Sequence, residues 1–384
     1  MKRQRRNTQR VGVRHNHLVS YPTPTNRSYH WGYGSMAGRM RVVQRVTGIF
    51  LAMHYAPHVT RAFDSVEHVM RDVNYGWRVR YMHANGASYF FAVRNRHRRR
   101  GRYYGSYVTP REQRWTSGVV RYLRIMGTGF MGYVLPFGQM SMWGATVITS
   151  LASARPGIGG ERVTWLWGGF SVENATLNRF YAIHYRRPFV VAGLALLHRV
   201  RLHGEGVGSG NPLGVDGNRD RTRFYPLFYV KDRMGRLRRW GAYSRTVYYM
   251  PNVLGHPDNY IEANAMVTPN HIVPEWYFRT YYGILRSVPH KLLGVRAMRA
   301  AIRRRATRPR THTSEVRSAT FRPRYRERYW RFVVTALRLG WVGQKVVAYP
   351  YVEVGQRATV YYFAYLVRRR PRRGRRESQL RRTH

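Results

Sequence analysis

Four histidines occur as two pairs with the same spacing. His83 and His97 are 14 residues apart, and so are His184 and His198. Fourteen residues rise about 21 Å along an α-helix and return to nearly the same face. Two helices with such pairs could hold two stacked porphyrins, each between two imidazoles, and filling both axial positions of an iron suits electron transfer rather than oxygen binding. On spacing alone, ordinary packing or surface histidines are an equally good interpretation.

Glycines repeat the same interval. Gly34 and Gly48 are 14 residues apart, as are Gly118 and Gly132. A glycine has no Cβ, so a flat macrocycle can approach its backbone closely. With 36 glycines in the chain, such coincidences are expected. Glycine segments that alternate with histidine segments nevertheless predict a four-helix bundle, in whose core cofactor sites are often built.

The tetrapeptide "PEWY" (274–277) places the carboxyl group of Glu275 among aromatic residues. A glutamate in an apolar pocket tends to have a raised pKa and can take up a proton near neutral pH. The alternative is the start of a helix, where proline fits the first turn and glutamate lies beside the helix dipole. These four residues alone favour the helix start.

The segment "YVKD" (229–232), together with His203, supplies a cation, a carboxylate and an imidazole. Such a group could form hydrogen bonds to a quinone carbonyl and exchange protons with it. The alternative, a solvated loop, is favoured when this segment is considered alone.

The composition of the 384 residues is strongly basic. There are 68 Lys and Arg residues against 17 Asp and Glu, a net charge of +51; only four of the basic residues are lysine, which leaves 64 arginines. Leucine, normally among the commonest residues, occurs 22 times. Such a charge predicts a binder of nucleic acid or of an anionic surface, although no nucleic-acid-binding motif is present. The absence of cysteine excludes disulfides, iron–sulfur ligation and cysteine nucleophiles.

The arginines interrupt apolar segments, so no run of 18 apolar residues exists. An arginine at the centre of a membrane helix costs about 2.5–3.5 kcal/mol. The segments nevertheless have the length of membrane helices, and loops with Gly, Pro, Asn and Asp separate them. The eight candidate spans are about 35–54, 77–104, 112–134, 175–204, 228–247, 289–308, 321–341 and 349–369.

Long strings of the sequence resemble the mitochondrial cytochrome b family, the haem-bearing subunits of respiratory complex III. The resemblance extends over about residues 15–370 in family order. Its strings include "TGIFLAMHYAPHV" (47–59), "YMHANGASYFF" (81–91), "GFMGYVLPFGQMSMWGATVITSLASA" (129–154) and "TPNHIVPEWYF" (268–278). It implies an all-α, multi-pass transmembrane bundle of eight helices. Residues 1–210 would form the haem-binding four-helix bundle and residues 211–384 a C-terminal domain with the "PEWY" loop.

The resemblance also implies a function. It implies ubiquinol oxidation and electron transfer through two b haems to a quinone-reduction site, coupled to proton translocation. The implied partners are the Rieske iron–sulfur subunit and cytochrome c1, in a homodimeric complex of the mitochondrial inner membrane. A basic, ribosomal-like nucleic-acid-binding protein is the alternative from another class, because it would account for the charge directly.

The resemblance implies roles for individual residues. His83 and His184 match the ligands of the low-potential haem, and His97 and His198 match those of the high-potential haem. Arg80 and Arg100 match partners of the haem propionates, and the haem-packing glycines match Gly34, Gly48, Gly118 and Gly132. The quinol-oxidation pocket matches Tyr133, Gly144, Glu275 and Tyr282, with Glu275 as the proton acceptor. The quinone-reduction pocket matches Ser35, His203, Lys231 and Asp232.

The excess of arginine is the main departure from the family pattern. Arginines such as Arg41, Arg94 and Arg121 stand where the family has apolar residues, often leucine, while the family arginines Arg80 and Arg100 are intact. We therefore hypothesise that one arginine codon is read as leucine when this protein is made. The hypothesis predicts that the anomalous arginines share a codon that is absent from the family positions.

Overall fold

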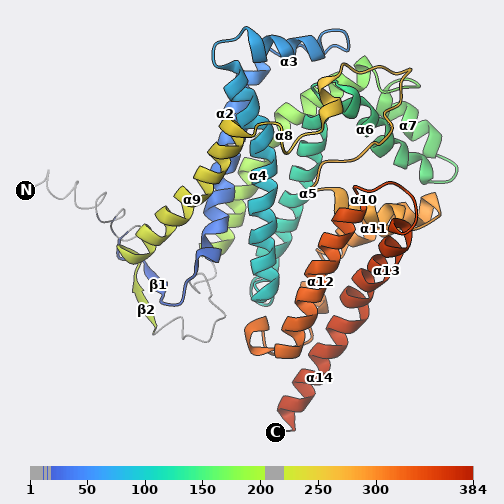
Figure 1. The fold of residues 1–384 in the computed structure, drawn as a ribbon. Helices are drawn as coiled ribbons and strands as arrows, with labels where there is room; N and C mark the ends of the chain where they lie inside the picture. The colour runs from blue at the N-terminus through green and yellow to red at the C-terminus, as the bar shows by residue number, and fades with distance from the viewer. Residues whose placement is uncertain (1–11, 13–14, 16–18, 204–219, 384) are drawn as a thin grey trace, which may run out of the picture.

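The first half of the chain forms four long helices that lie side by side (Figure 1). These helices are α2 (Tyr33–Ala52), α4 (Gly76–Tyr103), α5 (Glu112–Val134) and α8 (Asn174–His203). α2 packs closely against α4, and α5 packs against α8. The computed structural model describes residues 12, 15, 19–203 and 220–383, and almost all regular structure in them is helical. The predicted all-α fold is therefore confirmed.

The pairing of the helices follows from the stripes of side chains that they bury. In α5, Ser117, Arg121, Tyr122 and Ile125 are buried and recur at intervals of one, three or four residues. Spacing near 3.6 residues places such side chains on one face, which an amphipathic helix turns toward its neighbours. One of the residues on this buried face of α5 is an arginine.

The main hydrophobic core lies between α2, α4, α5 and a further helix, α9 (Leu227–Tyr249). Two hydroxyl groups fix α9 against α4: Tyr243 donates to the Met82 carbonyl over 2.6 Å, and Tyr89 donates to the Ala242 carbonyl over 2.7 Å. The buried members of this core include Met36, Met40, Phe90, Phe91, Tyr122, Ile125, Val191 and Val247.

The second half of the chain forms a smaller group of helices beside the first (Figure 1). They are α10 (Arg279–Arg286), α11 (Lys291–Arg303), α12 (Pro323–Val342), α13 (Tyr351–Ala364) and α14 (Arg370–Arg382), with a π-helical turn over Tyr365–Arg369 between the last two. Tyr281, Ile284, Phe332 and Leu339 form the centre of their own hydrophobic core. The helices from α10 onward thus share a core of their own, whereas α9 and Tyr277 pack into the first core.

Short elements connect the long helices at their two ends. At one end lie α3 (Ala62–Arg71), α6 (Gln139–Ser150) and α7 (Gly159–Trp167), drawn at the top of Figure 1. At the other end β1 (Pro22–Pro24) pairs antiparallel with β2 (Arg221–Arg223), with Thr23 opposite Thr222. Short 3₁₀ turns span Tyr29–Gly32, Leu151–Ala154, Pro257–Tyr260, Pro309–Thr311 and Ala319–Phe321.

Each of the eight predicted spans coincides with a helix, since α2, α4, α5, α8, α9, α11, α12 and α13 begin within three residues of the expected positions. The number of membrane crossings stays a prediction. In the described part of the chain, no helix is both long enough and apolar enough to meet a hydropathy criterion for a membrane span. The predicted domain boundary at residue 210 falls outside the described residues.

The backbones of α10 and α12 touch, which requires glycine at the crossing. A Cβ on Gly283 would overlap the carbonyl oxygen of Leu339, and one on Gly343 would overlap the carbonyl oxygen of Arg279. We predict that Gly283→Ala destabilises the protein by about 1–3 kcal/mol, because the helices must separate to admit the methyl group. The melting temperature of the purified protein measures this. Gly241→Ala in α9 is the control, because no atom lies within 4 Å of its added Cβ. An equal drop in both variants would contradict the close crossing.

Candidate functional site

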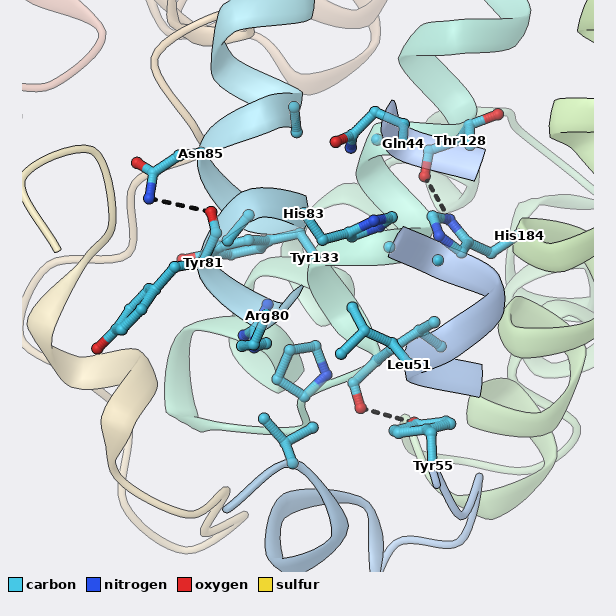
Figure 2. A pocket seen from close by; sticks show the side chains of 18 of the residues that line it. Gln44, Leu51, Tyr55, Arg80, Tyr81, His83, Asn85, Thr128, Tyr133 and His184 are labelled. Atoms are coloured by element: carbon cyan, nitrogen blue, oxygen red, sulfur yellow. Dashed lines mark hydrogen bonds between the residues drawn. The ribbon is translucent and has the colours of Figure 1, made fainter. Parts of the chain in front are cut away.

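A cavity of about 290 Å³ lies between α2, α4, α5 and α8, next to the loop that follows α9. We call it the upper cavity. His83 of α4 and His184 of α8 line it from opposite sides (Figure 2). Their ring centroids are 6.3 Å apart, and the ring planes are inclined by 74°. Since a metal–imidazole bond is about 2 Å long, this separation leaves room for one metal ion with a nitrogen ligand on each side.

Hydrogen bonds fix which ring nitrogen of these two histidines is free. The Thr47 hydroxyl donates its only hydrogen to the Val43 carbonyl over 2.7 Å, so over 2.9 Å it accepts a hydrogen from Nδ1 of His83. Nδ1 of His184 lies 2.9 Å from the Thr128 carbonyl, which can only accept. Both rings therefore carry their hydrogen on Nδ1, and Nε2 is available to bind a metal. Such outer partners orient metal ligands and strengthen them.

A second cavity of about 90 Å³, the lower cavity, lies further along the same helices. His97 of α4 and His198 of α8 line it. The Ser117 hydroxyl donates its hydrogen to the Arg114 carbonyl over 2.9 Å. It also lies 2.9 Å from Nδ1 of His198 and therefore accepts a hydrogen bond from that nitrogen. Nδ1 of His97 is buried without a hydrogen-bond partner. The structure thus places one histidine of α4 and one of α8 at each of the two cavities.

Each of the four predicted glycines faces one of the four histidines. A Cβ on Gly48 would lie 3.0 Å from the His83 ring, and one on Gly132 would overlap the His184 ring. At the lower cavity, a Cβ on Gly34 would lie 3.4 Å from His97, and one on Gly118 would lie 3.4 Å from His198. The glycines thus let each imidazole lie directly against the backbone of the partner helix. The residues of both cavities fit a haem between two imidazoles.

The two predicted propionate partners are divided between the cavities. Arg80 lines the upper cavity (Figure 2), and Arg100 lines the lower one. The guanidinium carbon of Arg100 lies 5.4 Å from the centre of the Trp31 ring, and its Nε atom is buried without a hydrogen-bond partner. A carboxylate entering either cavity would therefore find a guanidinium group.

Two of the four predicted quinol-pocket residues lie at the upper cavity. Tyr133 and Glu275 line it, whereas Gly144 and Tyr282 do not. No atom lies within 4 Å of a Cβ placed on Gly144, and the Tyr282 ring faces Arg286 at 5.3 Å. The structure thus brings the carboxyl group of Glu275 and the phenol of Tyr133 to the cavity that His83 and His184 also line.

The loop with Glu275 is held firmly against α4. The Trp276 indole donates to the Ser88 hydroxyl over 3.0 Å, and the Tyr277 ring stacks on Phe91 with centroids 3.9 Å apart and planes inclined by 6°. Burial raises the pKa of Glu275 to about 7, although the positive charge of Arg279 opposes this shift. The carboxyl group can therefore gain or lose a proton near neutral pH.

Three of the predicted quinone-reduction residues gather where α2 begins. The Ser35 hydroxyl donates to the Gly32 carbonyl over 2.9 Å. Lys231 donates to the Arg27 carbonyl over 2.9 Å, and the Arg27 guanidinium forms an ion pair with Asp232 at 3.3 Å. His203 ends α8, and its side chain lies outside the described residues.

Sequence reasoning missed Thr47, Ser117, Thr128 and Arg27. Two of them had a recognisable signal, because a hydroxyl residue directly precedes a predicted glycine in Thr47–Gly48 and in Ser117–Gly118. In the structure, each of these two hydroxyls contacts the histidine that the following glycine faces. Thr128 acts through its backbone carbonyl, which no side-chain pattern reveals.

Two family models match the chain. The model "Cytochrome b/b6/petB" matches residues 18–206, and "Cytochrome b(C-terminal)/b6/petD" matches residues 262–363. The chain is 56% identical over 357 residues to cytochrome b of Chondrus crispus, covering 93% of each. It is 57% identical over 349 residues to that of Phytophthora megasperma, covering 91% of each. A solved structure, "Hyperthermophilic respiratory Complex III", is similar with a TM-score of 0.91 and 27% identity over 96% of this chain and 97% of that one.

The hydroxyl partners of the histidines give a paired prediction. In Thr47→Val, Nδ1 of His83 loses its acceptor, so this imidazole becomes a weaker electron donor and the midpoint potential of a haem bound there should rise. Ser117→Ala should raise the potential at His198 instead. Redox titration of the haem absorbance measures both, and each variant is the control for the other. Equal shifts of both haems in either variant would contradict the assignment.

The glycines give a second prediction. Gly132→Ala should remove one of the two expected haems, because the added methyl group would overlap the His184 ring and displace it. Haem content per polypeptide, measured by absorbance of the extracted haem, should fall by about half. Gly193→Ala on α8 should retain full haem content, because nothing lies within 4 Å of its added Cβ. Full occupancy in Gly132→Ala would show that this glycine does not border a haem.

Proposed function

We propose a function in respiratory complex III for this chain, which belongs to the cytochrome b family. It is the cytochrome b subunit of that quinol–cytochrome c oxidoreductase, a membrane protein that binds b-type haem. The observation that carries the proposal is the facing pair His83 and His184 in a cavity that Glu275 also lines. The nucleic-acid-binding alternative finds no support, because the family models and relatives are all cytochromes b.

Two haems of b type fit the two cavities. His83 and His184 would hold the first, and His97 and His198 the second. A bound haem with two imidazole ligands supplies reversible transfer of one electron. Arg80 and Arg100 would each form charge-assisted hydrogen bonds to a propionate. The free Nε2 atoms of His83, His184 and His198 support these assignments.

Glu275 is the proton acceptor in quinol oxidation. Oxidation of a quinol to a quinone releases two protons, and a carboxylate within reach of the quinol hydroxyl can accept one of them. Glu275 is ionised above its pKa of about 7, so it is ready to act slightly above neutral pH. The contacts of Trp276 and Tyr277 with α4 keep the loop in place, and Tyr133 closes the cavity beside it. Gly144 and Tyr282 are assigned to this pocket from the family pattern alone.

Quinone reduction takes place at the opposite end of the bundle. Ser35, Lys231 and Asp232 lie where α2 begins, whereas Gly48 and the upper cavity lie near its end. Lys231 and Asp232 can donate and accept protons at a quinone carbonyl, together with His203 from the family pattern. Quinol oxidation would release protons at one end of the bundle, and quinone reduction would take up protons at the other end. Electron transfer between the two sites would therefore move charge across the bundle.

The remaining assignments follow from family membership. We propose that the chain crosses the mitochondrial inner membrane eight times and divides near residue 210 into a haem-binding half and a C-terminal half. Its partners are the Rieske iron–sulfur subunit and cytochrome c1 in a dimeric complex, and its substrate is ubiquinol. The chain has no cysteine to carry an iron–sulfur cluster itself, which agrees with a partner subunit in that role.

The test of this function is the purified native complex. It should show the reduced-minus-oxidised absorbance of b-type haem and reduce cytochrome c when a ubiquinol is added. A colourless protein without quinol-dependent reductase activity would contradict the proposal.

The pKa of Glu275 predicts a pH dependence. The rate of quinol oxidation should rise as the pH increases through about 7, because only the carboxylate accepts a proton. Glu275→Gln should lower the rate about 10²–10⁴-fold, the usual contribution of a general base, and remove this rise. Glu327→Gln, which changes an exposed carboxylate of α12, should leave the profile intact. A normal profile in Glu275→Gln would remove Glu275 from this role.

A further inference from the structure

Five of the eight arginines that line the lower cavity are Arg94, Arg98, Arg102, Arg121 and Arg305. Three of them are almost fully buried, with exposed fractions of 4% for Arg94, 6% for Arg121 and 9% for Arg305. The guanidinium carbons of Arg98 and Arg305 lie 3.9 and 4.7 Å from the centre of the same Tyr122 ring. Arg102 completes the group on α4. Positive charges thus gather around one tyrosine ring in the interior of the helix bundle.

Within the described part of the chain, no carboxylate lines the lower cavity to balance these charges. Each of the five arginines has at least one buried guanidinium nitrogen without a hydrogen-bond partner. The one side-chain hydrogen bond found within this group runs from Arg94 to the Gly118 carbonyl, over 2.8 Å. Buried charges persist in proteins when they are paired and hydrogen-bonded, and these are not paired.

Arg322 shows how the same fold treats an arginine that it accommodates. It is as buried as Arg94, with 4% of its surface exposed. Its Nε atom lies 2.6 Å from a carboxylate oxygen of Glu377, which also binds Arg373 at 3.1 Å. Arg94 and Arg322 therefore do not differ in burial. They differ because Arg322 has a carboxylate beside it and Arg94 does not.

We propose that the mature polypeptide carries leucine at positions 94, 98, 102, 121 and 305, because the codon at these positions is decoded as leucine rather than as arginine. Arg322 stays arginine. The composition supports leucine as the residue, since the chain has 64 arginines but only 22 leucines, whereas leucine is usually among the commonest residues and favours helices. Four of the five positions lie within α4 and α5.

The substitution has a structural consequence for the lower cavity. Leucine has no charge to bury and no donors to satisfy, and its side chain is shorter than that of arginine. The cavity of about 90 Å³ would become wider and lined largely by apolar groups, closer to the upper cavity of about 290 Å³. The group leaves out Arg100, whose Nε atom is also buried without a hydrogen-bond partner at the same cavity. Arg100 stays arginine because the proposed function assigns it to a haem propionate, and in this choice alone the inference rests on the proposed function.

Peptide mass spectrometry of the protein isolated from its own organism tests the inference. Digestion with endoproteinase Glu-C, which cuts at neither arginine nor leucine, yields peptides that contain positions 94, 98, 102, 121, 305 and 322 whichever residue is present. We expect leucine masses at the first five positions and an arginine mass at 322. In the gene, the first five positions should share a codon that position 322 does not use.

Two results would overturn the inference. Arginine masses at 94 and 121 would show that the charges are real and are carried in the bundle. Leucine at 322 as well would show that the presence of a carboxylate does not distinguish the two classes of position. Neither result depends on haem content or on reductase activity, so the proposed function is tested separately.

Discussion

Four contacts between an imidazole on one helix and a glycine on its partner set the geometry of the haem-binding half. Gly48 and Gly34 of α2 face His83 and His97 of α4, and the same arrangement recurs between α5 and α8. A methyl group at any of these glycines would contact or overlap the ring. The close approach within each helix pair therefore depends on the missing Cβ, and the two cavities lie between the pairs because the histidines point inward there.

The residue before the glycine adds a chemical constraint to this packing. Thr47 and Ser117 accept the Nδ1 hydrogens of His83 and His198, so the Nε2 atoms carry no hydrogen and are free to bind a metal. Short segments of four helices thus set the spacing of the histidines, the close packing of each helix pair and the orientation of the imidazole rings. The carboxyl group of Glu275 reaches the same cavity from a distant part of the sequence, through a loop that aromatic contacts hold against α4.

Local patterns predicted the long helices and the alternation of segments with paired histidines and segments with paired glycines, because these features repeat with the helical period. Which glycine faces which histidine comes from the structure alone. The sequence did not predict the short helices at the ends of the bundle or the ion pair of Arg27 with Asp232, which joins segments 205 residues apart. Gly144 and Tyr282 were expected at the quinol pocket, and the upper cavity does not include them. The net charge suggested a binder of nucleic acid or of an anionic surface, and the comparisons do not support this. Composition does not show which guanidinium groups have a carboxylate beside them.

The central claim is that one chain holds two haems, each between two imidazoles from α4 and α8. Haem extraction with polypeptide quantification, combined with electron paramagnetic resonance of the oxidised protein, tests it most directly. The account predicts two b haems per chain, both low-spin with two imidazole ligands. A single haem per chain, or a high-spin centre with an open axial position, would contradict it.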